Sequence, residues 1–430
     1  MSLPSVAIQT GVASPPAPAQ VEHNFLFIGE VDQGQEALQA IGPSTDLAAV
    51  FGSGALVDAI GAFRANAGQK WTAAAYGHAA RAAALDQAAV VDKGSGKVGL
   101  PATEHGLKPG VQVTIAGSTN YDGAYTLEPE TTADELVITA AYVIETLPAG
   151  ATATWTPGWA DLAGFLLADA LAAMPVPPEG VIFTLPVGTA TQLSDLQAAL
   201  GALLGQHKRM WACVRFRALE AGESWADYTA AFAALVAGAS AGRVLIVPTL
   251  WGQDLGAYAG AIARKATHQS PIWPGFGPVS GAGSKPSDAG GTPLSLATLE
   301  TLSAAKASVL MWHEGLAGIY PAQGFPLAGA GEPERIEWLQ VADKLARAVR
   351  LRALYRLGKG VRDVPADRAA FLQYISQPVR AAAAAGEIQP AQDADFQVAF
   401  PTPTSAALAF TWRPLDAAED ISVKLELDAG

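Results

Sequence analysis

The sequence predicts an α/β protein, mixed α+β in detail, whose central sheet is mainly parallel and covered by helices. From residue 158 onward, helical patterns alternate with strand-like runs such as "GVIFTLPV", "MWACVRF" and "RVLIVPTL". These runs are continuously apolar, as is typical of parallel strands that have helices on both faces. In residues 90–156 the pattern changes to runs rich in Val, Ile, Thr and Tyr that are separated by turn residues. This second observation predicts a small all-β domain inserted into the α/β body.

The composition excludes several classes of protein. The chain has 430 residues, of which half are apolar and 16% are charged, so it is long enough for a large core and too apolar for a disordered chain. Its net charge of −13 argues against nucleic acid or an anionic membrane as partner. A single cysteine, Cys213, excludes an internal disulfide and a thiolate metal cluster, and its apolar neighbours predict a buried strand thiol.

No segment predicts export or membrane insertion. The N-terminus lacks the basic and apolar regions of a secretory signal, and the apolar helical stretch at residues 159–174 is too short to span a bilayer. We therefore expect synthesis in the cytoplasm.

The first part of the body is placed at residues 21–89. It begins with a strand in "HNFLFIGEV", and helical patterns follow at residues 45–51 and 56–67. The inserted domain is placed at residues 90–156, where turns such as Pro109-Gly110 and Asp122-Gly123 separate short strands.

The second part of the body is placed at residues 157–415, with a subdomain at its C-terminal end. The Gly- and Pro-rich residues 270–293 predict a functional or mobile loop, because ordinary connections are shorter. A strand near residues 308–312 and a long helix at residues 336–357 follow. The runs "DFQVAFP" and "ALAFTWRPL" then predict two strands that form a hairpin.

Both ends of the chain have the same design, a short amphipathic strand on a proline-containing tether. We place an N-terminal arm at residues 1–20 and a C-terminal arm at residues 416–430. The alternating strand positions are Ser5, Val6, Ala7, Ile8 and Gln9 in the first arm, and Ile421, Val423, Leu425 and Leu427 in the second. A lone strand needs a partner edge for its backbone and an apolar surface for its side chains.

No motif predicts a catalytic, cofactor-binding or metal-binding residue. "GASAG" at residues 238–242 has the spacing of a hydrolase elbow around Ser240, but a helix enters it and a strand leaves it, the reverse of the required order. "GSGK" at residues 94–97 lacks the rest of a phosphate-binding loop. No two histidines have the spacing of a zinc pair on a helix.

A cluster of cations on the long helix stands out within an acidic chain. It is either a solvated helix face or a basic ridge directed at an acidic partner, with nucleic acid disfavoured by the lack of stacking aromatic residues. The positions of the cluster are Lys344, Arg347, Arg350, Arg352, Arg356 and Lys359.

The chain resembles the tail sheath proteins of contractile-tailed bacteriophages over nearly its whole length. The resemblance is carried by the order of several segments and not by any one of them. They are "PSVAIQTG", "FLFIGEV", "DLAAVFGSGALVDAIGAF", "VTIAGSTNYDGAYTL", "ACVRFRALEAGESWADYTAAFAALVAG", "VADKLARAVRLRAL" and the closing alternating strand.

The resemblance implies a sheath-type body and a virion protein that is not an enzyme. Its partners would be many copies of itself in a helical sleeve, the tail tube, and baseplate and terminator proteins at the ends. In that family, arms from two neighbouring subunits add strands to a sheet in the C-terminal domain of a third subunit, inserted domains face outward, and a helix near the lumen contacts the tube. Carried over here, the basic ridge would face the tube, and the acceptor strands would contain Phe396, Val398, Phe400, Leu408, Phe410 and Trp412.

Two alternatives remain open at this point. One is an α/β hydrolase-like enzyme, which requires a pocket with convergent polar groups near the carboxyl ends of the strands. The other is a monomeric surface or carbohydrate-binding protein that uses the inserted β domain.

Overall fold

A computed structural model describes residues 22–33, 37–355, 364–402 and 405–415. Its centre is a six-stranded sheet in the order β13-β12-β11-β1-β3-β2. All neighbouring strands are parallel except β2, which runs antiparallel to β3. The mainly parallel sheet predicted from the apolar runs is confirmed. The strands are β1 (Asn24–Glu30), β2 (Leu38–Ile41), β3 (Thr72–His78), β11 (Gly180–Val187), β12 (Trp211–Ala218) and β13 (Val244–Thr249).

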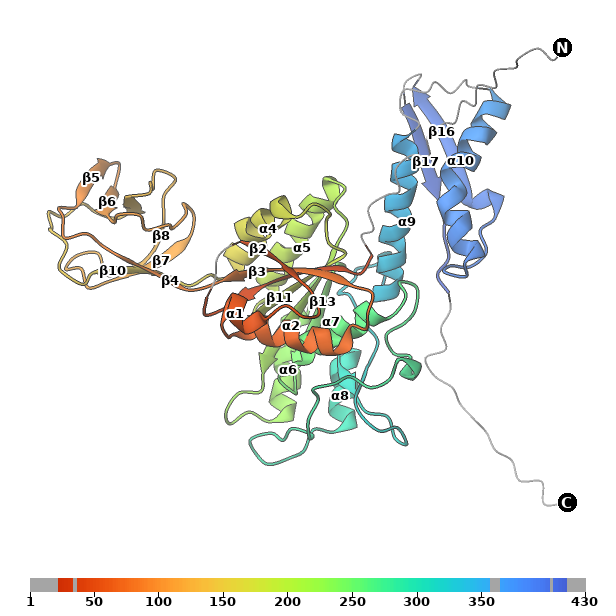
Figure 1. The fold of residues 1–430 in the computed structure, drawn as a ribbon, viewed down its shortest axis with the longest axis horizontal. Coiled ribbons are helices and arrows are strands. Elements are labelled where there is room, and N and C mark those ends of the chain that lie inside the picture. Colours follow the sequence, from red (N-terminus) through yellow and green to blue (C-terminus); the bar gives the residue numbers. More distant parts are fainter. Residues whose placement is uncertain (1–21, 34–36, 356–363, 403–404, 416–430) are drawn as a thin grey trace, which may run out of the picture.

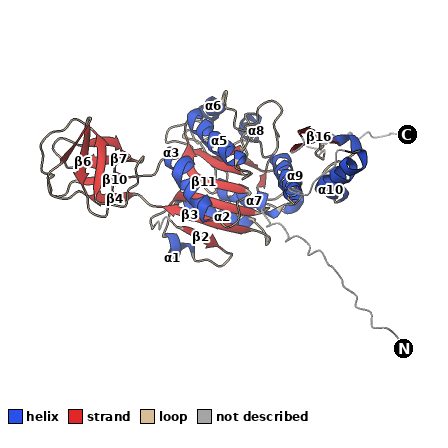
Figure 2. Cartoon of the chain, turned by 90° about the horizontal axis from the view of Figure 1, so that it is seen from above, coloured by secondary structure: helices blue, strands red, loops and turns tan. Residues whose placement is uncertain are grey.

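Helices cover both faces of this sheet (Figure 2). One face buries side chains of α1 (Leu47–Phe51), α2 (Ala55–Asn66) and α7 (Asp254–Arg264). The helices α2 and α7 pack so closely that a Cβ at Gly256 would lie 2.1 Å from the Ala59 carbonyl oxygen. The opposite face is covered by α3 (Trp159–Asp161), the π-helical turn η1 (Leu162–Leu166), α4 (Leu167–Ala173), α5 (Ala190–Gly205), α6 (Trp225–Val236) and α8 (Leu296–Ala304).

The β domain begins earlier in the chain than predicted. Its strand β4 (Arg81–Ala84) pairs with β10 (Thr152–Trp155), so the domain starts near residue 81 and not at residue 90. The sequence of β4, "RAAA", has no β-branched or aromatic residue, so only its pairing marks it as a strand. The other strands are β5 (Val91–Gly94), β6 (Lys97–Pro101), β7 (Gln112–Ala116), β8 (Gly123–Thr126) and β9 (Glu135–Thr139).

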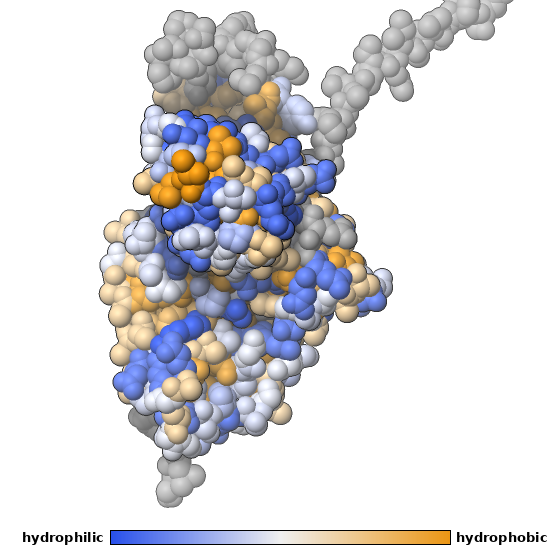
Figure 3. Space-filling model, turned by 90° about the vertical axis from the view of Figure 1, so that its left-hand side faces the viewer, coloured by the Kyte–Doolittle hydropathy of each residue, from blue (hydrophilic) through white to orange (hydrophobic). Residues whose placement is uncertain are grey.

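Two antiparallel sheets, β4-β10-β7-β8 and β5-β6-β9, enclose the core of this domain. The "GSGK" segment forms the turn between β5 and β6, where Gly94 and Gly96 have φ values of 75° and 73°. These glycines are therefore turn residues. The domain projects from one end of the body (Figure 1), and its far end shows apolar surface (Figure 3). Val91, Val143 and Ile144 are exposed apolar side chains of this domain.

A separate C-terminal domain lies at the other end of the body (Figure 1). It contains α9 (Ile336–Leu354), α10 (Pro365–Ala384), the 3-10 turn η3 (Asp393–Asp395), and the hairpin of β16 (Phe396–Thr402) and β17 (Ser405–Phe410). The long helix and the hairpin were predicted. Helix α10 was not, because it is rich in alanine and carries Pro378 in its interior.

Shorter elements connect α7 to α9. The loop predicted at residues 270–293 contains the 3-10 turn η2 (Pro274–Phe276), and the strand predicted near residue 310 is reduced to β14 (Leu310–Met311), paired with β15 (Tyr320–Pro321). Cys213 is buried in β12, as predicted, and burial raises the pKa of its thiol. In the described ranges, no helix has both the length and the apolar character that a membrane span requires.

Candidate assembly interface

The hairpin of the C-terminal domain places the predicted acceptor residues on one face. Phe396 is paired with Phe410, and Val398 with Leu408, so these four side chains share a face of the two-stranded ladder. They pack against α9 and α10, but only Phe396 is buried. Trp412 was predicted within the second strand, yet β17 ends at Phe410 and Trp412 packs beside the cluster from the following segment.

Both strands of this hairpin are edge strands in the part of the chain that the structure describes, because each has a strand neighbour on one side only. An apolar pocket lies between the helices and the hairpin, and its lining residues include Val349, Leu372, Val379, Phe396, Leu408 and Phe410. A free edge beside incompletely covered apolar side chains is the arrangement that accepts an added strand.

The predicted donor segments of the two arms, residues 5–9 and 421–427, lie outside the described residues. Arg356 and Lys359 of the predicted ridge lie outside them as well, and the side chain of Phe400 is not described. The donor strands therefore stay a prediction.

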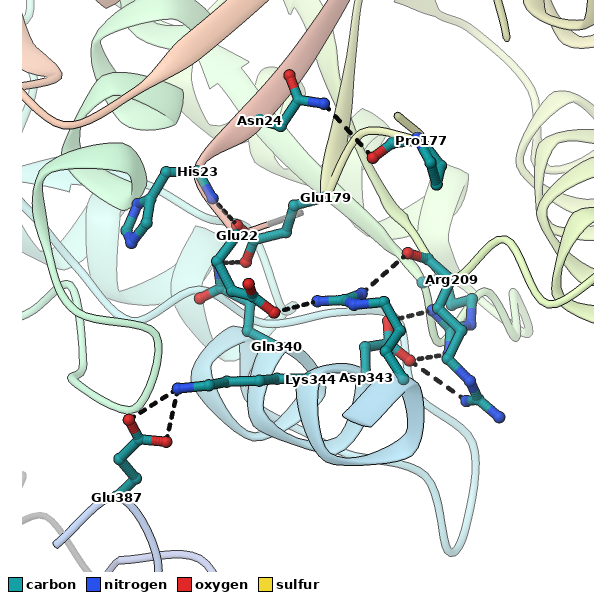
Figure 4. A network of polar contacts seen from close by, with 12 residues as sticks. Glu22, His23, Asn24, Pro177, Glu179, Arg209, Gln340, Asp343, Lys344 and Glu387 are labelled. Carbon is teal, nitrogen blue, oxygen red and sulfur yellow. Dashed lines mark hydrogen bonds and ion pairs between the residues drawn. The ribbon is translucent and has the colours of Figure 1, made fainter. Parts of the chain in front are cut away.

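Helix α9 joins the C-terminal domain to the body through two different faces. Val341, Leu345 and Val349, spaced four residues apart, are buried in the core that α9 shares with α10 and the hairpin. Gln340, Asp343 and Arg347 lie on the opposite side of the helix and face the body (Figure 4). The helix is thus apolar toward its own domain and polar toward the body.

The polar face of α9 contacts the amino-terminal edge of the parallel sheet. Asp343 accepts hydrogen bonds from both terminal nitrogens of Arg243, at 2.7 and 2.8 Å, and Arg243 directly precedes β13. Gln340 donates to Glu179, which directly precedes β11. Because ligands of open α/β sheets bind at the carboxyl edge, this edge is suited to domain attachment and not to catalysis.

A buried lysine completes this junction. Lys265 is 1% exposed, and its Nζ donates to the Gln340 side-chain oxygen at 2.7 Å. Burial lowers the pKa of Lys265 to about 8, against the opposing charges of Glu337 and Glu179. Burial likewise raises the pKa of Glu337, against the charge of Lys265. These groups stabilise one another in a region from which water is largely excluded.

The predicted basic ridge is divided among several partners. Lys344 binds both carboxylate oxygens of Glu387 at 2.7 Å, and Arg347 binds Glu22 at 2.9 Å. The guanidinium of Arg352 lies over the Tyr374 ring, 5.0 Å from its centroid, whereas Arg350 is exposed. The sequence could not show these pairings, since Glu22 is 325 residues from Arg347.

Ser240 lies in the segment that leads from α6 into β13, so the helix-to-strand order expected from the sequence is confirmed and the elbow geometry is not formed. A polar groove between the β domain and the body contains Asp161 and Asp195. Asp161 already accepts hydrogen bonds from the Trp155 indole and the Gly158 amide. Among the described residues, no group of three or more His, Cys, Asp or Glu side chains is arranged to hold a metal ion.

Two family descriptions match the chain, and the second match begins just before α9. "DUF2586, N-terminal domain" matches residues 8–325, and "DUF2586, C-terminal domain" matches residues 334–430. The chain belongs to the DUF2586 family.

A relative in Haemophilus phage HP1 (strain HP1c1), named "Putative tail sheath protein", is 30% identical over 222 residues. The alignment covers 48% of this DUF2586 chain and 59% of that relative, so the chain matches little more than half of the relative's length. The chain is therefore a homologue of a phage tail sheath protein, as the resemblance of its segments implied.

Solved structures extend the fold similarity to the whole chain. The sheath tail protein of Desulfitobacterium hafniense superposes with a TM-score of 0.54 at 15% identity, over 98% of this chain and 99% of the other. The sheath complex of an extracellular contractile injection system, PVC, in the contracted state gives a TM-score of 0.56 at 10% identity, over 100% and 98%. The DUF2586 chain has the fold of contractile sheath proteins, and these homologues are structural proteins and not enzymes.

Proposed function

We propose that this chain is the subunit of a contractile phage tail sheath, which polymerises helically around a tail tube and contracts to drive the tube through the host envelope. The observation that carries the proposal is that the sheath fold extends over the whole chain, including the C-terminal domain. The subunit would be made in the host cytoplasm and act in the virion, with the tube, baseplate and terminator proteins as partners.

Subunits would be joined by strand exchange at the β16–β17 hairpin. The donors are residues 5–9 and 421–427, and each would extend the two-stranded sheet of another copy over the apolar pocket. Ordering an arm costs roughly 1–2 kcal/mol per residue, which its backbone hydrogen bonds, at roughly 0.5–1.5 kcal/mol each, do not offset. The apolar side chains Ile421, Val423, Leu425 and Leu427 therefore decide whether the arm docks, at roughly 1.5–3 kcal/mol each.

Charge supports the C-terminal arm as a donor. Residues 416–430 contain five acidic side chains and one lysine, whereas residues 334–415 have more cations than anions within a chain of net charge −13. An acidic arm and a basic acceptor domain attract one another and disfavour unintended partners. The N-terminal 21 residues carry no charged side chain, which suits a strand that docks by apolar contact.

The contact with the tube is proposed for the exposed part of the basic helix. Lys344 and Arg347 already hold carboxylates of the same chain, so Arg350 is the cation of α9 that the fold leaves exposed toward a partner. The outward direction of the β domain is proposed from its position at the end of the body opposite the C-terminal domain (Figure 1).

The test is polymerisation of the purified chain, followed by negative-stain microscopy and sedimentation. We expect tubular polymers from the wild-type chain and none from a chain that lacks residues 419–430. Two double variants each place two aspartates on one face of the C-terminal arm, the apolar face in the first variant and the polar face in the second. Ile421→Asp with Val423→Asp should abolish polymers, whereas Ser422→Asp with Lys424→Asp should retain them, because only the first pair loses apolar contact. Normal sheaths from the truncated chain would contradict strand donation by this arm.

A further inference from the structure

The first residues that the structure describes are held against α9. Arg347 binds the Glu22 carboxylate at 2.9 Å, and both side chains are largely covered, with 14% and 21% of their surface exposed. Burial alone would raise the pKa of Glu22, but the hydrogen bond and charge of Arg347, with a smaller effect of Lys344, lower it. The Glu22 carboxylate is therefore ionised at neutral pH and forms an ion pair with Arg347.

The next residue fixes the direction of the chain. His23 has a φ of 62°, an uncommon conformation for a residue with a Cβ. Its amide donates to Glu179 at 2.5 Å, and its carbonyl accepts from the Thr72 amide at 2.9 Å. Glu179 also accepts from Gln340 of α9. A strained turn persists only where its surroundings hold it, and here they hold it on both sides.

The same helix carries the acceptor hairpin. Leu345 and Val349 of α9 are buried together with Phe396 of β16 in the core of the C-terminal domain. The root of the predicted N-terminal arm and the acceptor site are thus attached to opposite faces of one helix (Figure 4 shows the polar side).

We infer that Arg347 is a clasp that fixes the root of the donor arm to the helix bearing the acceptor hairpin, so that the donor and acceptor of one subunit move as a unit. This inference rests on the proposed strand exchange. In a sheath, part of the tension on an arm passes through Glu22 and Arg347 into α9, and from α9 into the hairpin that holds a neighbour's arm. The backbone carries the rest into the central sheet, because β1 begins at Asn24, directly after His23.

Arg347 is on this account a positioning residue and not a tube contact. A charge swap tests it, because Glu22→Arg combined with Arg347→Glu restores opposite charges at the same place. Arg350→Glu is the matched control, since it makes the same change in charge on the same helix at an exposed position, and the tube, to which we assign the Arg350 contact, is absent from the assay.

The measurement is the critical concentration for assembly without tube, after circular dichroism and thermal unfolding have shown that each monomer is folded. We expect Arg347→Glu to raise the critical concentration about tenfold, equivalent to about 1.4 kcal/mol. The charge swap should recover most of the loss, and Arg350→Glu should stay within twofold of wild type. If Arg347 only stabilised the monomer, Arg347→Glu would lower the melting temperature of the monomer, and the charge swap would not restore assembly.

The outcomes separate the two proposals. Normal assembly of Arg347→Glu, or failure of the swap to restore assembly, overturns the clasp while wild-type sheaths still support the proposed function. If wild-type protein forms no sheath, the proposed function fails and the clasp fails with it. Should Arg347→Glu not fold, Glu22→Gln replaces it, since the amide keeps the shape at a position near the surface. A raised critical concentration for Glu22→Gln supports the clasp, and an unchanged one overturns it.

Discussion

The body and the C-terminal domain bury their sheets in different ways. The six-stranded sheet of the body has helices on both faces, and its central strands have a neighbour on each side. The described hairpin of the C-terminal domain has two strands, helices on one face, and half-buried Val398, Leu408 and Phe410. The central strands of the body have their backbone and apolar groups satisfied within the chain, whereas each strand of a two-stranded sheet keeps groups that another strand can satisfy.

The largest expected contrast comes from the same truncation in each region. Phe27 is fully buried and packs edge-on against Phe63, 5.1 Å between centroids. We expect Phe27→Ala to lower the free energy of unfolding by ~3–5 kcal/mol, because it leaves a cavity that cannot collapse. Phe410→Ala should cost no more than about half of that in the monomer, since the side chain is partly solvated.

Chemical denaturation gives both free energies, and hydrogen exchange assigns each loss to its region. Phe410→Ala should also impair assembly, whereas its stability cost stays small. If Phe27→Ala and Phe410→Ala lowered the free energy of unfolding equally, the core around the hairpin would be complete in the monomer.

A second contrast compares two carboxylates of the C-terminal domain. Asp343 lies in the junction with the body, 2% exposed, and its ion pair with Arg243 is covered. Asp343→Ala should cost ~3 kcal/mol, because it leaves Arg243 buried without its counter-charge. Asp393→Ala is the control: its pair with Arg380 is solvated, 93% of the Asp393 side chain being exposed, so we expect less than ~1 kcal/mol.

Thermal unfolding followed by hydrogen exchange along α9 measures this pair of variants. Asp343→Ala should expose amides of α9 and of the strand ends it contacts. If both aspartate variants behave alike, the polar face of α9 does not secure the domain to the body.

The smallest expected effect depends on pH and should be confined to the body. His78 is fully buried at the end of β3, neither ring nitrogen has a hydrogen-bond partner, and burial lowers its pKa from 6.5 to about 4. As pH falls through 6.5, the unfolded chain takes up the proton first, so stability is lost between about pH 6.5 and 4. The loss should reach about 2 kcal/mol at pH 5.

Residues 334–430 contain no histidine, so the C-terminal domain lacks a contribution of this kind. Comparing the unfolding free energy of wild type and His78→Leu at pH 7 and pH 5 isolates the effect. The variant should lose about 2 kcal/mol less than wild type over that interval. Parallel pH profiles for the two proteins would show that the pKa of His78 is the same in the folded and the unfolded chain.

Much of the fold follows from local patterns. The apolar runs predicted β11, β12 and β13, and the helical patterns predicted α1 and α2 to within two residues at each end. The alternation around Phe396 and Leu408 predicted the hairpin, since one face of each strand is apolar. Strand β4 and helix α10 escaped prediction because runs of alanine fit a strand or a helix, and pairing or packing must decide between them.

The candidate interface was predictable only in part. The sequence identified the hairpin residues and the cations of α9, but it treated those cations as one surface. The structure shows that these cations differ in their contacts. Lys344 and Arg347 bind carboxylates of the same chain, and Arg350 is exposed.

The sequence by itself determined most of the strands and helices, though not β4 and α10, and which of their faces are apolar, because the spacing of side chains along a helix or strand is a local property. Only the tertiary structure decided that Arg347 meets Glu22 and that Gln340 meets Glu179, pairs separated by 325 and 161 residues. Such pairs depend on how the sheet is connected, which brings the starts of its parallel strands to a single edge. No spacing along the chain records which charged side chain will lie across that edge.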